Sequence, residues 1–266
     1  MVARKRSGHN SMKHQYPKTE PGCSLLSAIS CRQGRTRRPR LCCGVEMRAG
    51  KPCEYCLFVR ESTIRTIPKC TMLALAGSPI DVVILVESGV LKLSVNLADG
   101  RTQIVGLRFR GDVVTTQTLG SRWLATVEVV EDATLYFLDQ ARINTLKAEN
   151  PVVQSTWNAF AKRETEMTQD LLVTLGRRSP VERLAVFLHE LEIRHCRKAL
   201  NPHEIYIPIS RDEIGQYLGM ESETVSRQFT RLKNARCIEL LSPSRVIVKD
   251  RQIMKHLIAG VKIPHL

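Results

Sequence analysis

The sequence has no apolar run long enough to cross a membrane. Its longest apolar runs, such as residues 82–86, fall far short of the roughly 18 residues that a membrane-spanning helix needs. No apolar segment follows the charged residues 1–7, as a secretory signal would require. We therefore expect a cytoplasmic protein with no membrane partner.

The signatures of common enzyme classes are also missing. No phosphate-binding loop and no nucleophile elbow occur in the sequence. His189 and Glu190 begin a zinc-protease motif, but its second histidine would fall at Ile193. We expect that the protein is not an enzyme.

Acidic residues are scarce in the N-terminal part. Residues 1–60 contain 13 basic and three acidic residues, which accounts for most of the +14 net charge of the 266-residue chain. The segment is rich in arginine, glycine, serine and proline and has little apolar periodicity, which is typical of a flexible basic arm over residues 1–57. A solvated tail and a phosphate-binding arm both fit this composition.

Seven of the nine cysteines lie between positions 23 and 70. Without a secretory route we do not expect a disulfide framework. Cys53 and Cys56 have the C-x-x-C spacing that lets two thiolates bind one metal ion or cluster, but a second pair at matching spacing is missing. These two cysteines are therefore candidate metal ligands without a complete site.

Short β-rich runs alternate with turn residues from residue 67 to residue 138. Asp99 and Gly100 form a strong hairpin signal between two of these runs. The expected strands cover residues 81–87, 90–96, 102–109, 126–130 and 134–138. Several short strands without helical pattern between them predict an antiparallel barrel or roll.

A helix is expected over residues 150–176, with Asn150 as its N-cap, Pro151 as its first residue and Gly176 at its end. Steps of four and three residues along it relate Val153, Trp157, Phe160, Met167 and Leu171. This heptad pattern predicts the seam of a homodimer, but a helix lying on its own domain fits the same spacing. Glu164 also falls on the seam, where it would face its like-charged copy and keep such a dimer weak.

Two short helices joined through glycine follow. Ser210 opens the first helix with a capping box, and Gly219 ends it in a tight turn. Ser222 is placed to cap the second helix, which covers residues 223 to about 235, and a hairpin follows over residues 238–248. This order predicts a winged helix-turn-helix, a DNA-binding unit.

The start of the second helix carries Glu223, Ser226 and Arg227 on one exposed face. In a major groove a glutamate can accept a hydrogen bond from cytosine, and an arginine can bind guanine through two hydrogen bonds. A solvated face with a Glu223–Arg227 pair is the alternative. Three further residues are placed to contact DNA phosphates, which position a protein without reading sequence: Ser210, Arg211 and Arg245.

The chain resembles the bacterial catabolite-activator/fumarate-nitrate-reductase regulator (Crp/Fnr) family over about residues 60–258. The most specific segments are PVERLAVFL at 180–188 and SRDEIGQYLGMESETVSR at 210–227, and IPKCTMLALAG at 67–77 is similar to the family's first β-roll strands. The resemblance implies an α+β fold and a homodimeric transcription regulator of double-stranded DNA, with RNA polymerase as a partner. The implied parts are a β-roll over 58–149, a dimerisation helix over 150–176 and a winged helix-turn-helix over 177–266.

The resemblance also concerns the signal. Residues 223–227 are similar to the anaerobic-regulator branch, which reads TTGAT-like half-sites. We do not expect cyclic AMP, because Trp123 and Leu124 follow Arg122 where the family's phosphate-binding pair falls.

Oxygen-sensing members hold a four-iron cluster with three N-terminal cysteines and one cysteine in the β-roll. Here only Cys53 and Cys56 match the N-terminal set, and the β-roll position is Tyr136, a poor ligand for such a cluster. We therefore expect no resident cofactor. The alternative is a redox- or metal-sensing regulator in which another cysteine completes an iron-sulfur or metal site, the candidates being Cys42, Cys43 and Cys70.

Overall fold

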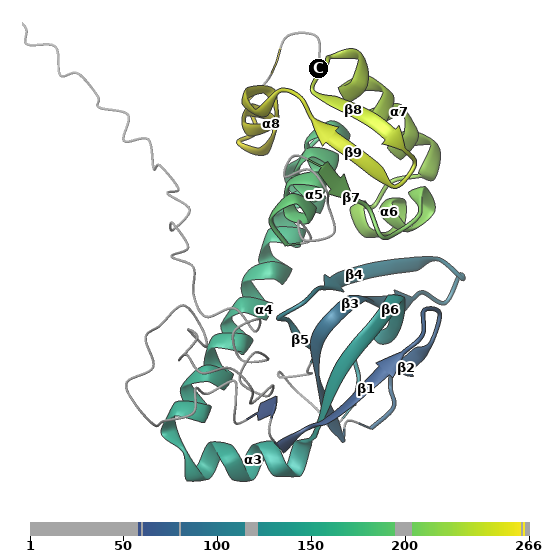
Figure 1. The fold of residues 1–266 in the computed structure, drawn as a ribbon. Helices are drawn as coiled ribbons and strands as arrows, with labels where there is room; N and C mark the ends of the chain where they lie inside the picture. Colours follow the sequence, from purple (N-terminus) through teal and green to yellow (C-terminus); the bar gives the residue numbers. More distant parts are fainter. Residues whose placement is uncertain are drawn as a thin grey trace, which may run out of the picture.

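The computed structural model describes residues 58–59, 61–79, 81–114, 122–194, 204–261 and 263. The expected basic arm over residues 1–57, with Cys53 and Cys56, lies outside these residues. A β-roll comes first, a long helix runs beside it, and a small domain of helices and a three-stranded sheet follows (Figure 1).

The β-roll is one antiparallel sheet in which two long strands carry the shorter ones. Its strands are β1 (Thr63–Ile67), β2 (Met72–Ala74), β3 (Val82–Asn96), β4 (Thr102–Arg108), β5 (Val113–Val114) and β6 (Thr126–Asp139). The order is β1-β6-β3-β4, with β2 on β6 and β5 on β3. Apolar side chains from β3 and β6, such as Val86, Leu91, Val127 and Leu135, fill its interior.

The expected strands at 81–87 and 90–96 are a single strand, β3, and those at 126–130 and 134–138 are a single strand, β6. Ser88 and Gly89 form an irregularity within β3 instead of a turn, and the register with β6 shifts there. Gly89 has φ +86°, and a Cβ on it would lie 2.6 Å from the Cα of Ala133. The glycine therefore permits a close approach of two strands.

Two helices follow the roll: α3 (Gln140–Glu149), which was not expected, and α4 (Pro151–Arg177). The Asn150 side chain accepts a hydrogen bond from the Val152 amide at 3.0 Å, which confirms Asn150 as the N-cap. Gly176 lies inside α4 and does not end it. Figure 1 shows α4 running along the roll toward the C-terminal domain.

The heptad face of α4 lies against its own subunit. Val153 and Trp157 are buried, Trp157 being 7% exposed, in a cluster with Phe58 and Ile143. Glu164 pairs with Arg108 of β4 at 2.8 Å, so its carboxylate has a cationic partner within its own subunit. The rest of the expected seam is half-buried: Phe160 packs against the same cluster, Met167 lies near Arg108, and Leu171 packs against the C-terminal core.

Within the subunit the helix thus lies on its own domain, as the second alternative describes. The heptad spacing could not decide between the two, because a sheet and a second helix both select the same apolar face. Within the subunit, the side chains of the expected dimer seam contact the roll or the C-terminal domain, and their role in a dimer stays a prediction: Val153, Trp157, Phe160, Met167 and Leu171.

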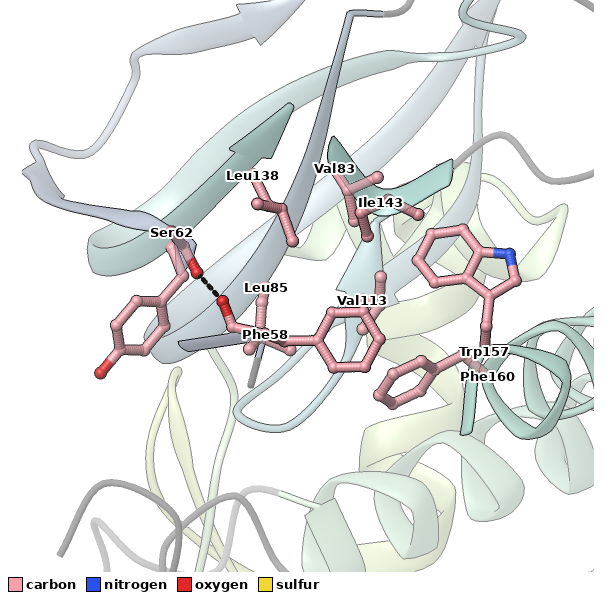
Figure 2. A pocket seen from close by; sticks show the side chains of 10 residues that line it. Phe58, Ser62, Val83, Leu85, Val113, Leu138, Ile143, Trp157 and Phe160 are labelled. Carbon is pink, nitrogen blue, oxygen red and sulfur yellow. Dashed lines mark hydrogen bonds between the residues drawn. The ribbon is translucent and has the colours of Figure 1, made fainter. Parts of the chain in front are cut away.

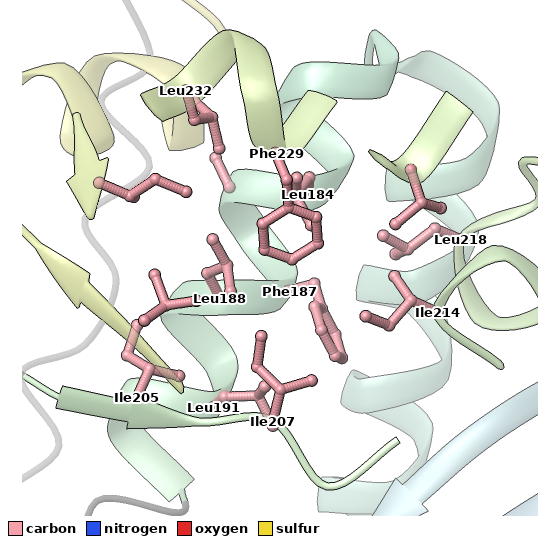
Figure 3. Close-up of a cluster of buried hydrophobic side chains, with 14 of the residues drawn as sticks. Leu184, Phe187, Leu188, Leu191, Ile205, Ile207, Ile214, Leu218, Phe229 and Leu232 are labelled. Atoms are coloured by element: carbon pink, nitrogen blue, oxygen red, sulfur yellow. The ribbon is translucent and has the colours of Figure 1, made fainter. Parts of the chain in front are cut away.

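The C-terminal domain packs helices on a small sheet. Its elements are α5 (Pro180–Arg194), β7 (Glu204–Tyr206), α6 (Arg211–Leu218), α7 (Ser222–Asn234), β8 (Ile238–Ser242), β9 (Arg245–Val248) and α8 (Arg251–Ile258). The sheet order is β7-β9-β8, and neither β7 nor α8 was expected. Figure 3 shows Leu184, Phe187 and Leu188 of α5 meeting Ile214 of α6 and Phe229 of α7 in the core.

This core continues into the β-roll. Ile104, Leu107 and Phe109, at the β4 end of the roll, belong to the same buried cluster as the C-terminal domain. Lys92 of β3 also pairs with Glu213 of α6 at 2.7 Å, and Asp112 pairs with Arg194 of α5. The C-terminal domain is therefore packed on the roll by both apolar and charged contacts.

Candidate nucleic-acid interface

The sharp turn between α6 and α7 depends on local sequence. Ser210 Oγ accepts a hydrogen bond from the Glu213 amide at 3.2 Å, and the Glu213 carboxylate accepts one from the Ser210 amide at 2.9 Å. This is the expected capping box. At the other end Gly219 takes φ +62°, and the Met220 amide donates to the Gly215 carbonyl at 3.0 Å. The two helices are thus fixed relative to each other.

Gly215 has a role in this turn that the sequence analysis missed. A Cβ at this position would overlap the Met220 carbonyl oxygen. The glycine therefore lets the chain fold back closely over α6 after the turn. A glycine inside a short helix, where it is unfavourable, was the available signal.

Helix α7 buries one face and exposes another. Val225, Phe229 and Leu232 are buried against α5 and α6, whereas Glu223, Ser226 and Arg227 are exposed. The three expected base-reading side chains therefore lie together at the start of α7, on the side away from the core.

The alternative of a Glu223–Arg227 pair has little support in the geometry, because Arg227 donates to Thr224 Oγ1 at 2.9 Å instead. Ser222 is the first residue of α7 and not its cap. The N-cap is Glu221, whose side chain makes no capping hydrogen bond.

The three expected phosphate contacts have different surroundings. Ser210 Oγ is already used by the capping box, and Arg245 pairs with Glu204. Arg211 stacks on the Phe229 ring, with its Cζ 3.3 Å from the ring centroid, and its Nη1 is buried with no hydrogen-bond partner among the described residues. Burial lowers the pKa of Arg211 to about 10, so the guanidinium remains charged at neutral pH.

Comparison with known proteins fits this geometry. Residues 64–150 match the cyclic nucleotide-binding domain family, and residues 182–257 match the Crp-like helix-turn-helix domain family. A probable transcriptional activator of Rhizobium leguminosarum is 31% identical over 172 residues, which are 65% of this chain and 71% of that protein. The nitrogen fixation regulation protein FixK of Bradyrhizobium diazoefficiens is 34% identical over 168 residues, covering 60% of this chain and 70% of FixK.

The chain belongs to the Crp/Fnr family of transcription regulators. The solved structure of FixK2 from Bradyrhizobium japonicum supports the α+β fold, with a TM-score of 0.68 and 24% identity over 76% of this chain and 98% of FixK2. The expected family, its FixK-like branch, the fold class and the role in DNA-binding transcription regulation are thereby confirmed.

The nucleotide-binding region of this Crp/Fnr chain differs from a phosphate pocket. Trp123 is buried in the interior of the roll, and Leu124 is exposed. Arg122 Nη1 donates to the Gly77 carbonyl at 2.6 Å, so this guanidinium is already hydrogen-bonded within the roll. A cyclic phosphate bound here would lie beside the apolar side chain of Trp123, which is unfavourable for a charged group. That the protein does not bind cyclic AMP stays a prediction.

The β-roll residue at the position of the family's fourth cluster ligand, Tyr136, lies in surroundings that do not suit an iron-sulfur cluster. Tyr136 is buried with Val59 and Leu85. It also lines a mostly apolar pocket between the roll and α4, to which Phe58 and Trp157 contribute (Figure 2). Among the described residues no group of three or more histidine, cysteine or acidic side chains could hold a metal ion. A phenol among apolar side chains is a poor match for an iron-sulfur cluster.

Within the described part of the chain, no helix is long and apolar enough to span a bilayer.

Proposed function

We propose that this Crp/Fnr regulator binds a two-fold symmetric, TTGAT-like DNA site as a homodimer in the cytoplasm, and that it has no enzymatic activity. The observation that carries the proposal is the exposed group formed by Glu223, Ser226 and Arg227 on a helix whose opposite face is buried. One α7 enters the major groove at each half-site. RNA polymerase is the proposed protein partner, by resemblance to the family alone.

Base reading falls to Arg227 and Glu223 in this proposal. Arg227 would bind O6 and N7 of a guanine, and Glu223 would accept from the N4 amino group of a cytosine. Because Thr224 Oγ1 is a neutral and exposed partner, Arg227 can leave it for a base at small cost. Ser226 donates to the Ser222 carbonyl at 3.0 Å and can rotate its hydroxyl toward a base edge.

Phosphate contacts position the helix in the groove. Arg211 is the strongest candidate because its charge lies at the first residue of α6 and no ion pair of the described residues neutralises it. Ser210 and Arg245 would contribute more weakly, since each already has a partner within the domain. Such contacts raise the affinity for all DNA and make binding salt-dependent.

The proposed dimer surface adjoins the predicted seam, on the face of α4 that lies roughly 20° to 80° around the helix axis from Trp157. Thr165, Thr168 and Leu172 follow one another there with steps of three and four, and all are exposed. Leu172 is 71% exposed, which is unusual for a leucine on the side of a long helix. Small side chains followed by leucine allow a second α4 to approach closely, so the proposed occupant of this stripe is a second copy of the chain.

Fluorescence anisotropy on two labelled duplexes tests the proposal. One duplex carries an inverted TTGAT repeat, and the other carries the same bases in scrambled order. At physiological salt we expect binding to the repeat to be tighter by about 10³-fold or more, and to weaken as salt is raised. Equal affinity for both duplexes would contradict sequence-specific binding.

A further inference from the structure

Arg183 joins three segments of the chain through their backbones. It lies in the first turn of α5, just after the junction with α4. Its Nη2 donates to the Leu175 carbonyl at 2.7 Å, its Nε to the Arg178 carbonyl at 3.0 Å, and its Nη1 to the Leu218 carbonyl at 2.9 Å, with Gly219 O farther away at 3.3 Å. One guanidinium therefore links the last turn of α4 to the last turn of α6.

The chemistry of these acceptors suits an arginine. The last carbonyls of a helix have no partner within the helix and carry partial negative charge. Leu175 lies in the last turn of α4, and Leu218 is the last residue of α6. The fixed fork of the guanidinium can serve both helix ends at once, whereas a lysine would reach fewer of these carbonyls.

Direct packing at the same place supports the link. A Cβ built on Gly219 would lie 3.4 Å from Cδ2 of Leu175 and 3.6 Å from Nη1 of Arg183. The end of α4 thus lies against the glycine of the helix-turn-helix itself. Only Met220 and Glu221 separate Gly219 from the start of α7.

We infer that Arg183 is a positioning residue that fixes the direction of α7 relative to α4, and so sets the spacing of half-sites that the dimer accepts. The inference rests on the proposed dimer and its symmetric site. In a dimer joined through α4, each α7 must keep a fixed orientation to its own α4 if both are to enter grooves at one separation. Without the clamp each domain still folds and binds a half-site, but only the contacts with the roll hold its orientation, so the separation of the two α7 helices varies more.

Inverted TTGAT repeats whose central spacer varies through about one helical turn (~10 base pairs) test this inference. Wild-type protein should prefer one spacing by at least about tenfold, and Arg183→Gln should lower this preference below about threefold. The affinity for a single half-site should stay within about twofold of wild type. The dimer dissociation constant measured by sedimentation should also stay within about twofold. Arg177→Gln, which removes an exposed charge at the same junction, is the matched control and should keep the preference.

Two further variants keep the inference falsifiable if Arg183→Gln does not fold. Arg183→Lys keeps the charge at both helix ends but loses the fork, and Leu175→Ala removes the contact with Gly219 without touching a hydrogen bond. Both should weaken the preference for one spacing. A full preference in Arg183→Lys and Leu175→Ala would overturn the inference. If wild type itself shows no preferred spacing, the proposed symmetric site fails first.

Discussion

Arg227 is the residue that most directly separates base reading from simple charge attraction. Its side chain is exposed at the start of α7, and its hydrogen-bond partner, Thr224, lies on the same helix. Glu223 lies one turn before it, so both can reach neighbouring base pairs. Arg231 lies one turn further along α7 and is exposed as well.

Arg227→Ala should remove a contact with two hydrogen bonds in each half-site. We expect a loss of about 1–3 kcal/mol per half-site on the specific duplex and a relaxed preference at one base pair. Arg231→Ala, the control, should weaken specific and scrambled duplexes alike. Anisotropy titrations measure both, and equal weakening of the two duplexes by Arg227→Ala would show that another residue reads the base.

At the scale of elements, the α6–α7 turn and α4 contain glycines with opposite surroundings. A side chain on Gly215 would collide with the Met220 carbonyl, whereas nothing lies within 4 Å of the Cβ position on Gly176. Gly215 is required because the backbone at Met220 approaches it closely. Gly176 only lowers the stability of the helix, since glycine is a poor helix former.

Gly215→Ala should therefore destabilise the folded protein by about 1–3 kcal/mol, because the backbone of the turn must shift. Gly176→Ala should instead stabilise it by up to about 1 kcal/mol, since alanine favours a helix more than glycine does. Urea unfolding followed by circular dichroism measures both changes. Equal effects of the two substitutions would contradict the close approach at Gly215.

The dimer stripe of α4 makes a separate prediction. Leu172→Lys should turn the dimer into a monomer in analytical ultracentrifugation, because two charged side chains would meet in the interface. Val173→Lys, which replaces an exposed neighbour on another face of α4, should leave the dimer intact. A dimer that survives Leu172→Lys would place the interface elsewhere.

The elements differ in how far the sequence predicts them. Local signals were sufficient for the N-cap at Asn150, the capping box at Ser210 and the buried face of α7. The neighbour of the heptad face was not predictable, because spacing shows which side of a helix is apolar and not what covers it. Long-range contacts such as Arg108–Glu164 and the Arg183 hydrogen bonds leave no local pattern in the sequence.

At the scale of the whole molecule, the roll and the C-terminal domain share one core, and Lys92–Glu213 and Asp112–Arg194 cross between them. A signal received by the roll therefore has packed elements through which to act on α6 and α7. An iron-sulfur cluster would not be coupled to the roll by a thiolate, because Tyr136, packed among apolar side chains, occupies the position of the family's β-roll cysteine.

DNA affinity measured without oxygen should consequently change little on brief exposure to air. Cys53→Ser should keep binding to the TTGAT-like repeat within about threefold, or ~0.7 kcal/mol. Iron content and visible absorption of anaerobically purified protein provide the parallel readout. Loss of binding in air together with bleaching of a brown chromophore would mean that the arm holds a cluster, with Cys42, Cys43 or Cys70 replacing the ligand that Tyr136 does not provide.

Selection of bound duplexes from a random DNA pool tests the central claim, because it examines sequence reading and two-fold symmetry together. The full chain should enrich inverted repeats with TTGAT-like half-sites at one spacing, as two copies of α7 in a symmetric dimer require. Enrichment of a single half-site, or of no sequence at all, would contradict the account of this protein as a dimeric, sequence-specific regulator.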